Sequence, residues 1–284
     1  MLSVLGTGPQ VLVQDAGRVG YAHLGVPRAG ALDAPAARLG NRLVGNPAGA
    51  AVLEVLLGGL ALRAEAGCWV AVTGAEVAVS VDEVARGHGR AEWLPAGSVL
   101  RLGVPRVGLR SYVAVAGGIA VDPVLGSRST DTLAWVGPPP VTVGNVLPVG
   151  AARGVPAGVE APLPRRPGPL RLLPGPHPEL FGELGALTRT RWEVLPASNR
   201  IGLRLSGPAV PRAAGELPSE GTVLGAVQVP PDGRPVVLLA DRGPTGGYPV
   251  AAVVHPDDLW QCAQLRPGEG VSFRAWGPRS AGRG

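Results

Sequence analysis

The sequence predicts a mainly β protein with two barrel-like halves, and three observations support this prediction. The chain has 44 glycines and 31 prolines among 284 residues, about a quarter of its length. Glycine costs about 1 kcal/mol and proline about 3 kcal/mol inside a helix, so long helices are excluded. Hydrophobic residues make up 45% of the chain, which is enough for a core. They occur in short runs interrupted by glycine and proline, as in sandwiches and barrels.

Each predicted strand is one of these runs of apolar or alternating residues. In the first half of the chain the runs are Val11–Gln14, Ala51–Leu57, Trp69–Thr73, Val77–Val81, Val99–Leu102 and Tyr112–Ala116. In the second half they are Leu170–Leu173, Trp192–Leu195, Leu203–Leu205, Ala226–Val229, Val236–Ala240, Ala251–Val254 and Val271–Arg274.

Three helices are predicted, and their apolar stripes should face the core. Asp33 caps the first, with Pro35 in its first turn. The second begins at Pro178, and Asp257 or Asp258 caps a short third one. Apolar residues at helical spacing in the three segments are Leu39, Leu43 and Val44; Leu180, Phe181, Leu184 and Leu187; and Leu259, Cys262 and Leu265.

A linker is predicted at residues 155–169, which hold five prolines and a single leucine. It would separate an N-terminal β-barrel-like domain, residues 1–154, from a C-terminal barrel domain, residues 170–284. Two echoes span the linker: Val11–Tyr21 resembles Val237–Tyr248, and Pro95–Leu102 resembles Pro267–Arg274. Chance similarity and two related barrels both explain echoes of this length.

The charge composition excludes several functions. All 26 basic residues are arginine, so the chain has no lysine for a Schiff base, a pyridoxal phosphate anchor, a P-loop or covalent biotin. The net charge is +5, but the arginines are scattered and only Arg165 and Arg166 are adjacent. Nucleic-acid binding calls for a basic face with stacking aromatics, so no nucleic-acid partner is expected.

The remaining composition indicates a cytoplasmic protein with no membrane partner. Cys68 and Cys262 fit no metal or redox spacing, which favours two buried thiols in a reducing compartment. The N-terminus has no basic region typical of a secretory signal. The uncharged stretch Thr132–Ala152 is long enough to span a bilayer, but its four prolines would leave backbone groups unsatisfied in lipid. It is expected to be a buried loop or strand region.

The common catalytic motifs are absent from the sequence. It contains no G-x-S-x-G, H-E-x-x-H, G-x-G-x-x-G or Walker A pattern. The histidines at positions 23, 88, 177 and 255 are isolated, so a histidine metal site would need four distant loops to converge. No metal ligand is therefore assigned.

Five polar, glycine-flanked loops are the candidate functional elements, because acids and arginines are unfavourable in an apolar protein unless paired. In the first loop, Gln14–Tyr21, Asp15 precedes Arg18 by three residues across a glycine turn. The two side chains can lock the turn as an ion pair, or Arg18 can be presented to a substrate carboxylate or phosphate. The other loops are Gly126–Asp131, Ser198–Gly202, Ser219–Gly221 with Gln228, and Asp241–Tyr248.

At these loops the sequence resembles a known family. The motifs that carry the resemblance are QDAGRVGYAHLGVPRAGALD (14–33), LGNRLVGN (39–46), VAGGIAVDPVLGSRSTD (115–131), SNRIGLRL (198–205), SEGTVLGAVQVPPDG (219–233) and DRGPTGGYP (241–249). Their order is that of the carboxyltransferase-type family known as allophanate hydrolase subunit 2. Its members include the C subunit of the bacterial ATP-dependent 5-oxoprolinase, an antagonist of a sporulation-kinase inhibitor, and part of urea carboxylase.

The resemblance implies a cyclophilin-like β-barrel architecture and a heteromeric complex. The partners would be a homologous protein of the subunit 1 type, which is the B subunit of the oxoprolinases, and an amidohydrolase-like A subunit. For the oxoprolinase members, which are the most similar, the implied reaction is the ATP-driven opening of 5-oxo-L-proline to L-glutamate. ATP with Mg²⁺ would be used by the complex, with no covalent biotin on this chain.

The polar loops would then carry the site. Asp15, Glu220 or Asp241 would orient water, hold Mg²⁺ or accept a proton. Donors for the developing negative charge would come from four loops, through Arg18, Arg128, Arg200 and Arg242. Substrate or nucleotide binding would involve Gln14, Asp33, Asn41, Ser127, Ser129, Asp131, Asn199, Arg200, Gln228, Arg242, Thr245 and Tyr248.

Two other functions remain open from the sequence. One is carboxyl transfer in a urea or allophanate pathway, with the carboxybiotin carried by another chain. The other is non-catalytic binding of a kinase-inhibitor partner. Gly243-Pro244 stands where relatives often have a polar residue and Thr, and Leu56 where they often have Thr. The first change removes a hydroxyl and an N–H beside Asp241.

Overall fold

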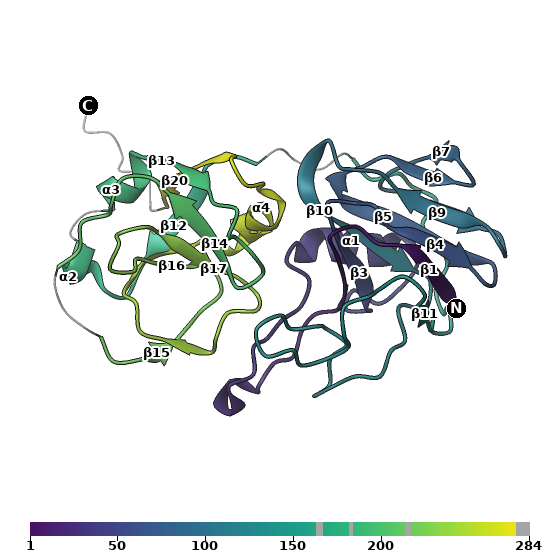
Figure 1. The fold of residues 1–284 in the computed structure, drawn as a ribbon, viewed down its shortest axis with the longest axis horizontal. Coiled ribbons are helices and arrows are strands. Elements are labelled where there is room, and N and C mark those ends of the chain that lie inside the picture. Colours follow the sequence, from purple (N-terminus) through teal and green to yellow (C-terminus); the bar gives the residue numbers. More distant parts are fainter. Residues whose placement is uncertain (163–166, 182–183, 214–216, 277–284) are drawn as a thin grey trace.

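The computed structural model describes residues 1–162, 167–181, 184–213 and 217–276, and it is mainly β as predicted (Figure 1). Two bodies lie side by side, with strands β1–β11 in one and β12–β20 in the other. Every predicted run of apolar residues falls within or overlaps a strand. The described strands that the sequence did not predict are short: β1, β4, β7, β8, β11, β15 and β18.

The N-terminal body consists of two antiparallel sheets. The first has the order β11-β1-β4-β9-β6-β7, with β1 Leu2–Gly6, β4 Ala61–Ala64, β6 Val79–Val81, β7 Val84–Arg86, β9 Val99–Leu102 and β11 Val146–Leu147. The second has the order β2-β3-β10-β5-β8, with β2 Gln10–Gln14, β3 Val52–Leu56, β5 Cys68–Glu76, β8 Ala91–Leu94 and β10 Val107–Val115. Buried residues of both sheets, such as Val4 and Leu53, form one core. This body is therefore a sandwich in which neither sheet closes on itself.

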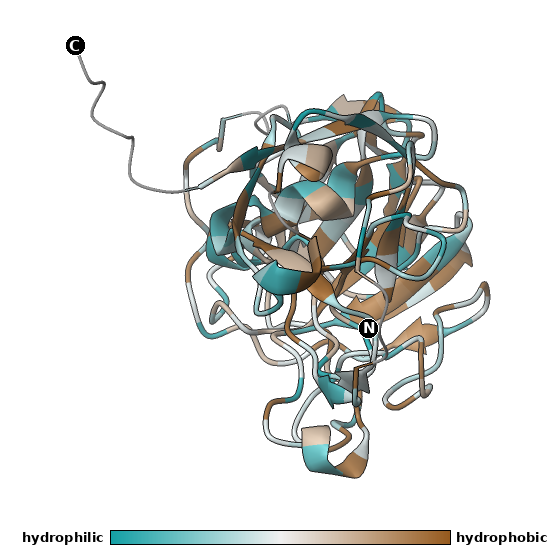
Figure 2. Ribbon diagram, turned by 90° about the vertical axis from the view of Figure 1, so that its left-hand side faces the viewer, coloured by the Kyte–Doolittle hydropathy of each residue, from teal (hydrophilic) through white to brown (hydrophobic). Residues whose placement is uncertain are grey.

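The C-terminal body is a closed barrel, which confirms the predicted β-barrel. Its strand order is β12-β19-β16-β17-β14-β13-β20, with β12 Leu170–Pro174, β13 Arg191–Val194, β14 Gly202–Ser206, β16 Ala226–Gln228, β17 Val236–Leu238, β19 Val250–Val254 and β20 Gly270–Ala275. Trp192 and Phe273 are among the buried residues inside it. Strands β15 (Glu220–Gly221) and β18 (Thr245–Gly246) pair outside the barrel. In Figure 2 apolar segments lie mainly along the strands.

The first predicted helix is confirmed as α1, Ala34–Leu43. The Oδ1 of Asp33 accepts a hydrogen bond from the Ala36 N–H at 2.9 Å, so the predicted cap is present. The segment that begins at Pro178 is described as two short helices, α2 (Pro178–Phe181) and α3 (Gly185–Thr188).

The third predicted helix is α4, Leu259–Gln264, preceded by the 3-10 turn η2, Pro256–Asp258. Asp258 stands at the N-cap position of α4, as predicted, but its side chain makes no capping hydrogen bond. His255 caps the 3-10 turn instead, and the Asp258 carboxylate receives two hydrogen bonds of 2.8 Å from the Arg171 guanidinium. A bidentate arginine is a stronger partner than one backbone N–H.

The two bodies meet at the outer face of the second sheet. Helix α1 packs on β5 and β10, and helix α4 of the C-terminal body packs on β10 beside it. Residues 132–152, expected to be buried, form a largely exposed loop region that contains β11. No described residue between β11 and β12 belongs to a strand, and the domain division at residues 155–169 stays a prediction. No helix among the described residues is long and apolar enough to span a membrane.

Candidate functional site

The first polar loop folds around the carboxylate of Asp15, which follows directly after β2. This carboxylate accepts hydrogen bonds from the hydroxyls of Ser127 and Ser129 at 2.6 Å each, and from the N–H groups of Arg128 at 2.6 Å and Gly17 at 2.8 Å. Burial raises the pKa of Asp15, but these hydrogen bonds outweigh it and hold the pKa below its usual value. The ion pair of Asp15 with Arg18 that the sequence offered as one alternative is not formed among the described residues, and the partners of Asp15 come mainly from the second polar loop.

Gly17 is required at the turn between Asp15 and Arg18, which brings the Arg18 guanidinium to the carbonyl oxygens of Ser129 and Val136. Its φ is +81°, and a Cβ there would lie 2.6 Å from the carbonyl oxygen of Arg28. Arg18 is only 3% exposed, and its Nη2 donates to the carbonyl oxygens of Ser129 and Val136. Its Nε and Nη1 are buried without a partner in the described residues. Burial lowers the pKa of Arg18, and the nearby carboxylates of Asp131, Asp15 and Asp241 oppose this shift.

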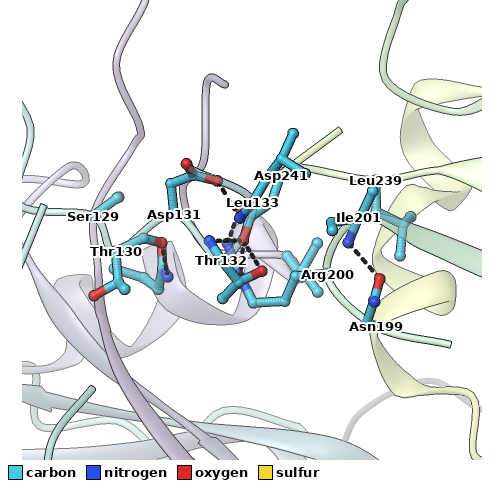
Figure 3. A network of polar contacts seen from close by, with 12 residues as sticks. Ser129, Thr130, Asp131, Thr132, Leu133, Asn199, Arg200, Ile201, Leu239 and Asp241 are labelled. Atoms are coloured by element: carbon cyan, nitrogen blue, oxygen red, sulfur yellow. Dashed lines mark hydrogen bonds and ion pairs between the residues drawn. The ribbon is translucent and has the colours of Figure 1, made fainter. Parts of the chain in front are cut away.

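A second polar network lies between the two bodies and centres on Arg200 (Figure 3). The guanidinium is 1% exposed and binds Asp241 through Nε at 2.8 Å and Nη2 at 2.9 Å. Its Nη1 donates to Glu54 of β3 at 2.5 Å. Asp241 also accepts hydrogen bonds from the N–H of Thr132 at 2.9 Å and its hydroxyl at 2.7 Å. Burial lowers the pKa of Arg200, but the combined effect of the two carboxylates is larger, so its pKa lies above the usual value.

Glu54 extends this network through the N-terminal body. Its Oε2 accepts hydrogen bonds from the Tyr112 hydroxyl at 2.9 Å and from the N–H of Leu32 at 3.0 Å. The Tyr112 hydroxyl accepts from the N–H of Asp33 at 2.8 Å, and the Asp33 carboxylate accepts from Nε2 of Gln264 at 2.8 Å. The network thus runs from barrel to sandwich and back to helix α4.

Sequence reasoning missed three buried members of this network, Glu54, Tyr112 and Gln264. It also missed Arg110, whose Nε lies 3.5 Å from Oε1 of Glu54. One signal was available for Glu54: it is a lone acid within the apolar run AVLEVLL. A charge in the middle of a central strand needs a buried partner. The sequence does not say which of the 26 arginines that partner is.

A cavity of about 380 Å³ opens between the two bodies, next to the Asp15 loop. Among its lining residues are four that the sequence singled out: Gln14, Asp15, Asn41 and Arg242. Asn41 is held by its Nδ2, which donates to the carbonyl oxygens of Ala48 and Ala50. The structure therefore gathers part of the predicted set around one cavity.

Other predicted residues have local roles. The Asp131 carboxylate accepts from the N–H groups of Leu133 and Ala134, and the Asn199 side chain accepts from those of Ile201 and Gly202. Such bonds are typical of Asx turns.

A third predicted group lies on or beside the paired strands β15 and β18 and on barrel strand β16, among residues that do not line this cavity. Glu220 Oε1 is 3.3 Å from Nε2 of His177. Gln228 donates to the carbonyl oxygen of Tyr248 at 3.2 Å, while Tyr248 and Thr245 are exposed. Among the described residues, no hydrogen bond or ion pair joins Glu220 to Asp15.

The sequence comparison identifies the class of protein to which this fold and site belong. Residues 24–275 match the family model described as "Carboxyltransferase domain, subdomain A and B", and the chain belongs to this family. It is 39% identical to the C subunit of 5-oxoprolinase from Escherichia coli, over 96% of this chain and 90% of that protein.

Two solved structures extend the comparison. The crystal structure of TTHA0988 has a TM-score of 0.89 and 43% identity, over 96% of this chain and 55% of that one. The urea amidolyase of K. lactis has a TM-score of 0.88 and 30% identity, over 96% of this chain and 18% of that one. The chain thus spans about half of the first structure and under a fifth of the second.

Proposed function

We propose that this chain is the C subunit of a cytoplasmic, ATP-dependent 5-oxoprolinase, which converts 5-oxo-L-proline and water to L-glutamate. The observation that carries the proposal is the 39% identity to the C subunit of the Escherichia coli 5-oxoprolinase across nearly the full length of both chains. The corresponding C subunit from Haemophilus influenzae is 32% identical over 97% of this chain and supports the same function.

The partners we propose are a homologous B subunit and an amidohydrolase-like A subunit. A lactam carbonyl is a poor electrophile, so its opening by water needs activation. ATP, when bound, supplies the phosphoryl group that makes the ring carbon reactive. The described residues contain no group of three or more His, Cys, Asp or Glu that could hold a metal ion. Mg²⁺ commonly binds through substrate phosphates and one or two carboxylates, and we propose that it enters the complex with ATP.

The residues of this chain would position and stabilise rather than react covalently. Asp15 already accepts four hydrogen bonds, so its role would be to fix the loop 126–131 and thereby Arg128. Arg242, which lines the cavity, would supply donors for the developing charge. Arg128 lies outside the cavity lining and its Nε donates to the carbonyl oxygen of Val121 at 2.6 Å, so it would donate through its Nη groups. The Nε of Arg242 is buried without a partner in the described residues, and Arg242 lines the cavity, which fits a ligand at that place.

The test is reconstitution. The three proteins are purified together, and glutamate release from 5-oxoproline is measured with and without ATP. ATP-dependent release that requires this chain supports the proposal. No release by the complete, folded complex contradicts it.

The site is tested separately in the same complex. Arg128→Ala should lower kcat by at least about tenfold, because one donor to a transition-state charge is worth that much or more. Arg86→Ala, on the exposed strand β7, is the matched control and should leave kcat unchanged. Equal turnover by the two variants would show that Arg128 is not part of the site.

A second candidate function is carboxyl transfer, favoured by the similarity to urea amidolyase. The donor would be carboxybiotin on another chain, since this one has no lysine to carry biotin. A complex that carboxylates urea in the presence of a biotinylated partner, and leaves 5-oxoproline unchanged, would favour this function.

A further inference from the structure

Three arginines from three separate segments line the cavity between the two bodies. Arg28 lies in the loop after the 3-10 turn η1 (Ala22–Leu24), Arg38 is on helix α1, and Arg242 follows strand β17 in the barrel. Only Arg242 was singled out from the sequence. The cavity therefore draws positive charge from both bodies.

Carboxylates at the cavity do not balance these charges. The two acids that line it are Asp15 and Asp257. Asp15 already accepts four hydrogen bonds, and Asp257 lies 3.7 Å from both Arg171 and His255. Among the described residues, none of the three arginines has a carboxylate within 4.0 Å.

Two buried polar atoms at the cavity also lack partners in the described part of the chain. Gln14 is fully buried and its Nε2 donates to the carbonyl oxygen of Thr130 at 2.8 Å, but its Oε1 has no donor. The Nε of Arg242 has no acceptor, while its Nη1 and Nη2 donate long hydrogen bonds to the carbonyl oxygens of Leu239 at 3.5 Å and Thr222 at 3.3 Å. Burial and the neighbouring Arg28 guanidinium lower the pKa of Arg242. The guanidinium groups of Arg28 and Arg242 are thus close enough to repel each other, and a bound anion would relieve this repulsion.

We propose that this cavity is a phosphate-binding site, in which Arg28, Arg38 and Arg242 hold a ligand with two or more negative charges. Guanidinium groups bind phosphoryl oxygens through paired, charge-assisted hydrogen bonds, and three of them exceed what one carboxylate can neutralise. A volume of about 380 Å³ accommodates a small phosphorylated molecule or the phosphate tail of a nucleotide.

The site rests in part on the proposed function, which needs a phosphoryl donor, but it can be tested alone. Pyrophosphate, tripolyphosphate, ATP and acetate are titrated into the purified chain by calorimetry at fixed ionic strength. We expect both polyphosphates to bind and acetate to bind at least about tenfold more weakly. ATP that binds no tighter than tripolyphosphate indicates a site for the phosphate tail, whereas tighter binding by ATP indicates a site that also holds the nucleoside.

The double variant Arg28→Ala/Arg242→Ala should weaken pyrophosphate binding by at least about tenfold, because two charge-assisted contacts are lost. The control Arg86→Ala should bind as the unaltered chain does. Equal melting temperatures for the two variants would show that the effect is not unfolding.

The proposal is overturned if pyrophosphate does not bind, if acetate binds as well, or if the double variant binds normally. An active complex whose chain fails to bind pyrophosphate would disprove the site and leave the proposed function standing. Arginine-dependent pyrophosphate binding in an inactive complex would support the site and contradict the proposed function.

Discussion

The pKa values of Asp15 and Asp33 are shifted in opposite directions because the surroundings of the two carboxylates differ. Asp15 is half-buried and gathers four donors, so its pKa is lowered. Asp33 is 4% exposed and has two donors, from Ala36 and Gln264. Burial therefore prevails, with a small addition from Glu54, and raises the pKa of Asp33 to about 6. Sequence patterns identified both residues, but the direction of each shift depends on partners distant in the chain.

The raised pKa of Asp33 predicts a pH dependence of stability. Between about pH 4 and pH 6 the folded chain holds this proton while the unfolded chain has lost it. Asp33 therefore contributes stability that is fully present below about pH 4 and is lost as pH rises through 6, by up to about 3 kcal/mol. Urea unfolding of the unaltered chain and of Asp33→Asn across this range isolates the effect. A constant difference between the two would contradict it.

Asp15→Ala should lower the free energy of unfolding by about 3 kcal/mol near neutral pH. The change leaves the hydroxyl of Ser129 and the N–H of Arg128 without their acceptor in a partly buried loop. Since the pKa of Asp15 is lowered, its contribution is present above about pH 4 and is lost as pH falls through the folded pKa. The control is Asp122→Ala, an exposed residue, measured by the same urea unfolding. Equal losses in the two variants would contradict the role of Asp15.

At the scale of elements, strands were predicted better than the ends of helices. Apolar runs such as Val99–Leu102 coincide with strands because burial on a pleated sheet needs little more than the pattern. The side-chain cap of α4 is missing because the carboxylate of Asp258 has a stronger partner in Arg171, on a distant strand. Closure of the barrel and the open sandwich depend on pairings such as β12 with β20, which no local pattern specifies.

Helix α4 is predicted to hold the two bodies together through Gln264. Its Oε1 accepts from the N–H groups of Leu109 and Arg110, and its Nε2 donates to Asp33 and to the carbonyl oxygen of Arg110. Gln264→Ala should lower the free energy of unfolding by about 2–4 kcal/mol. The control on the same helix is Gln261→Ala, whose Oε1 accepts one hydrogen bond, from Gly168. Similar losses in the two variants would contradict the prediction.

At the scale of the whole molecule, the two bodies share a buried ionic network and build a cavity where they meet. Sequence motifs found both residues and assigned Arg200 to substrate or nucleotide binding and Asp241 to catalysis, whereas the structure gives them contacts across the boundary. Arg200→Met should lower the free energy of unfolding by about 3–5 kcal/mol, because it leaves Glu54 and Asp241 buried without their cation. Urea unfolding checks this. A loss below about 1 kcal/mol would mean that the bodies do not depend on the network.

The central claim is that this chain is a necessary part of an enzyme that couples ATP hydrolysis to lactam opening. The most direct measurement follows phosphate and glutamate together in the reassembled complex, with this chain present or omitted. We predict equal amounts of the two products when the chain is present and neither when it is absent. Glutamate formation at the same rate without the chain would contradict the account.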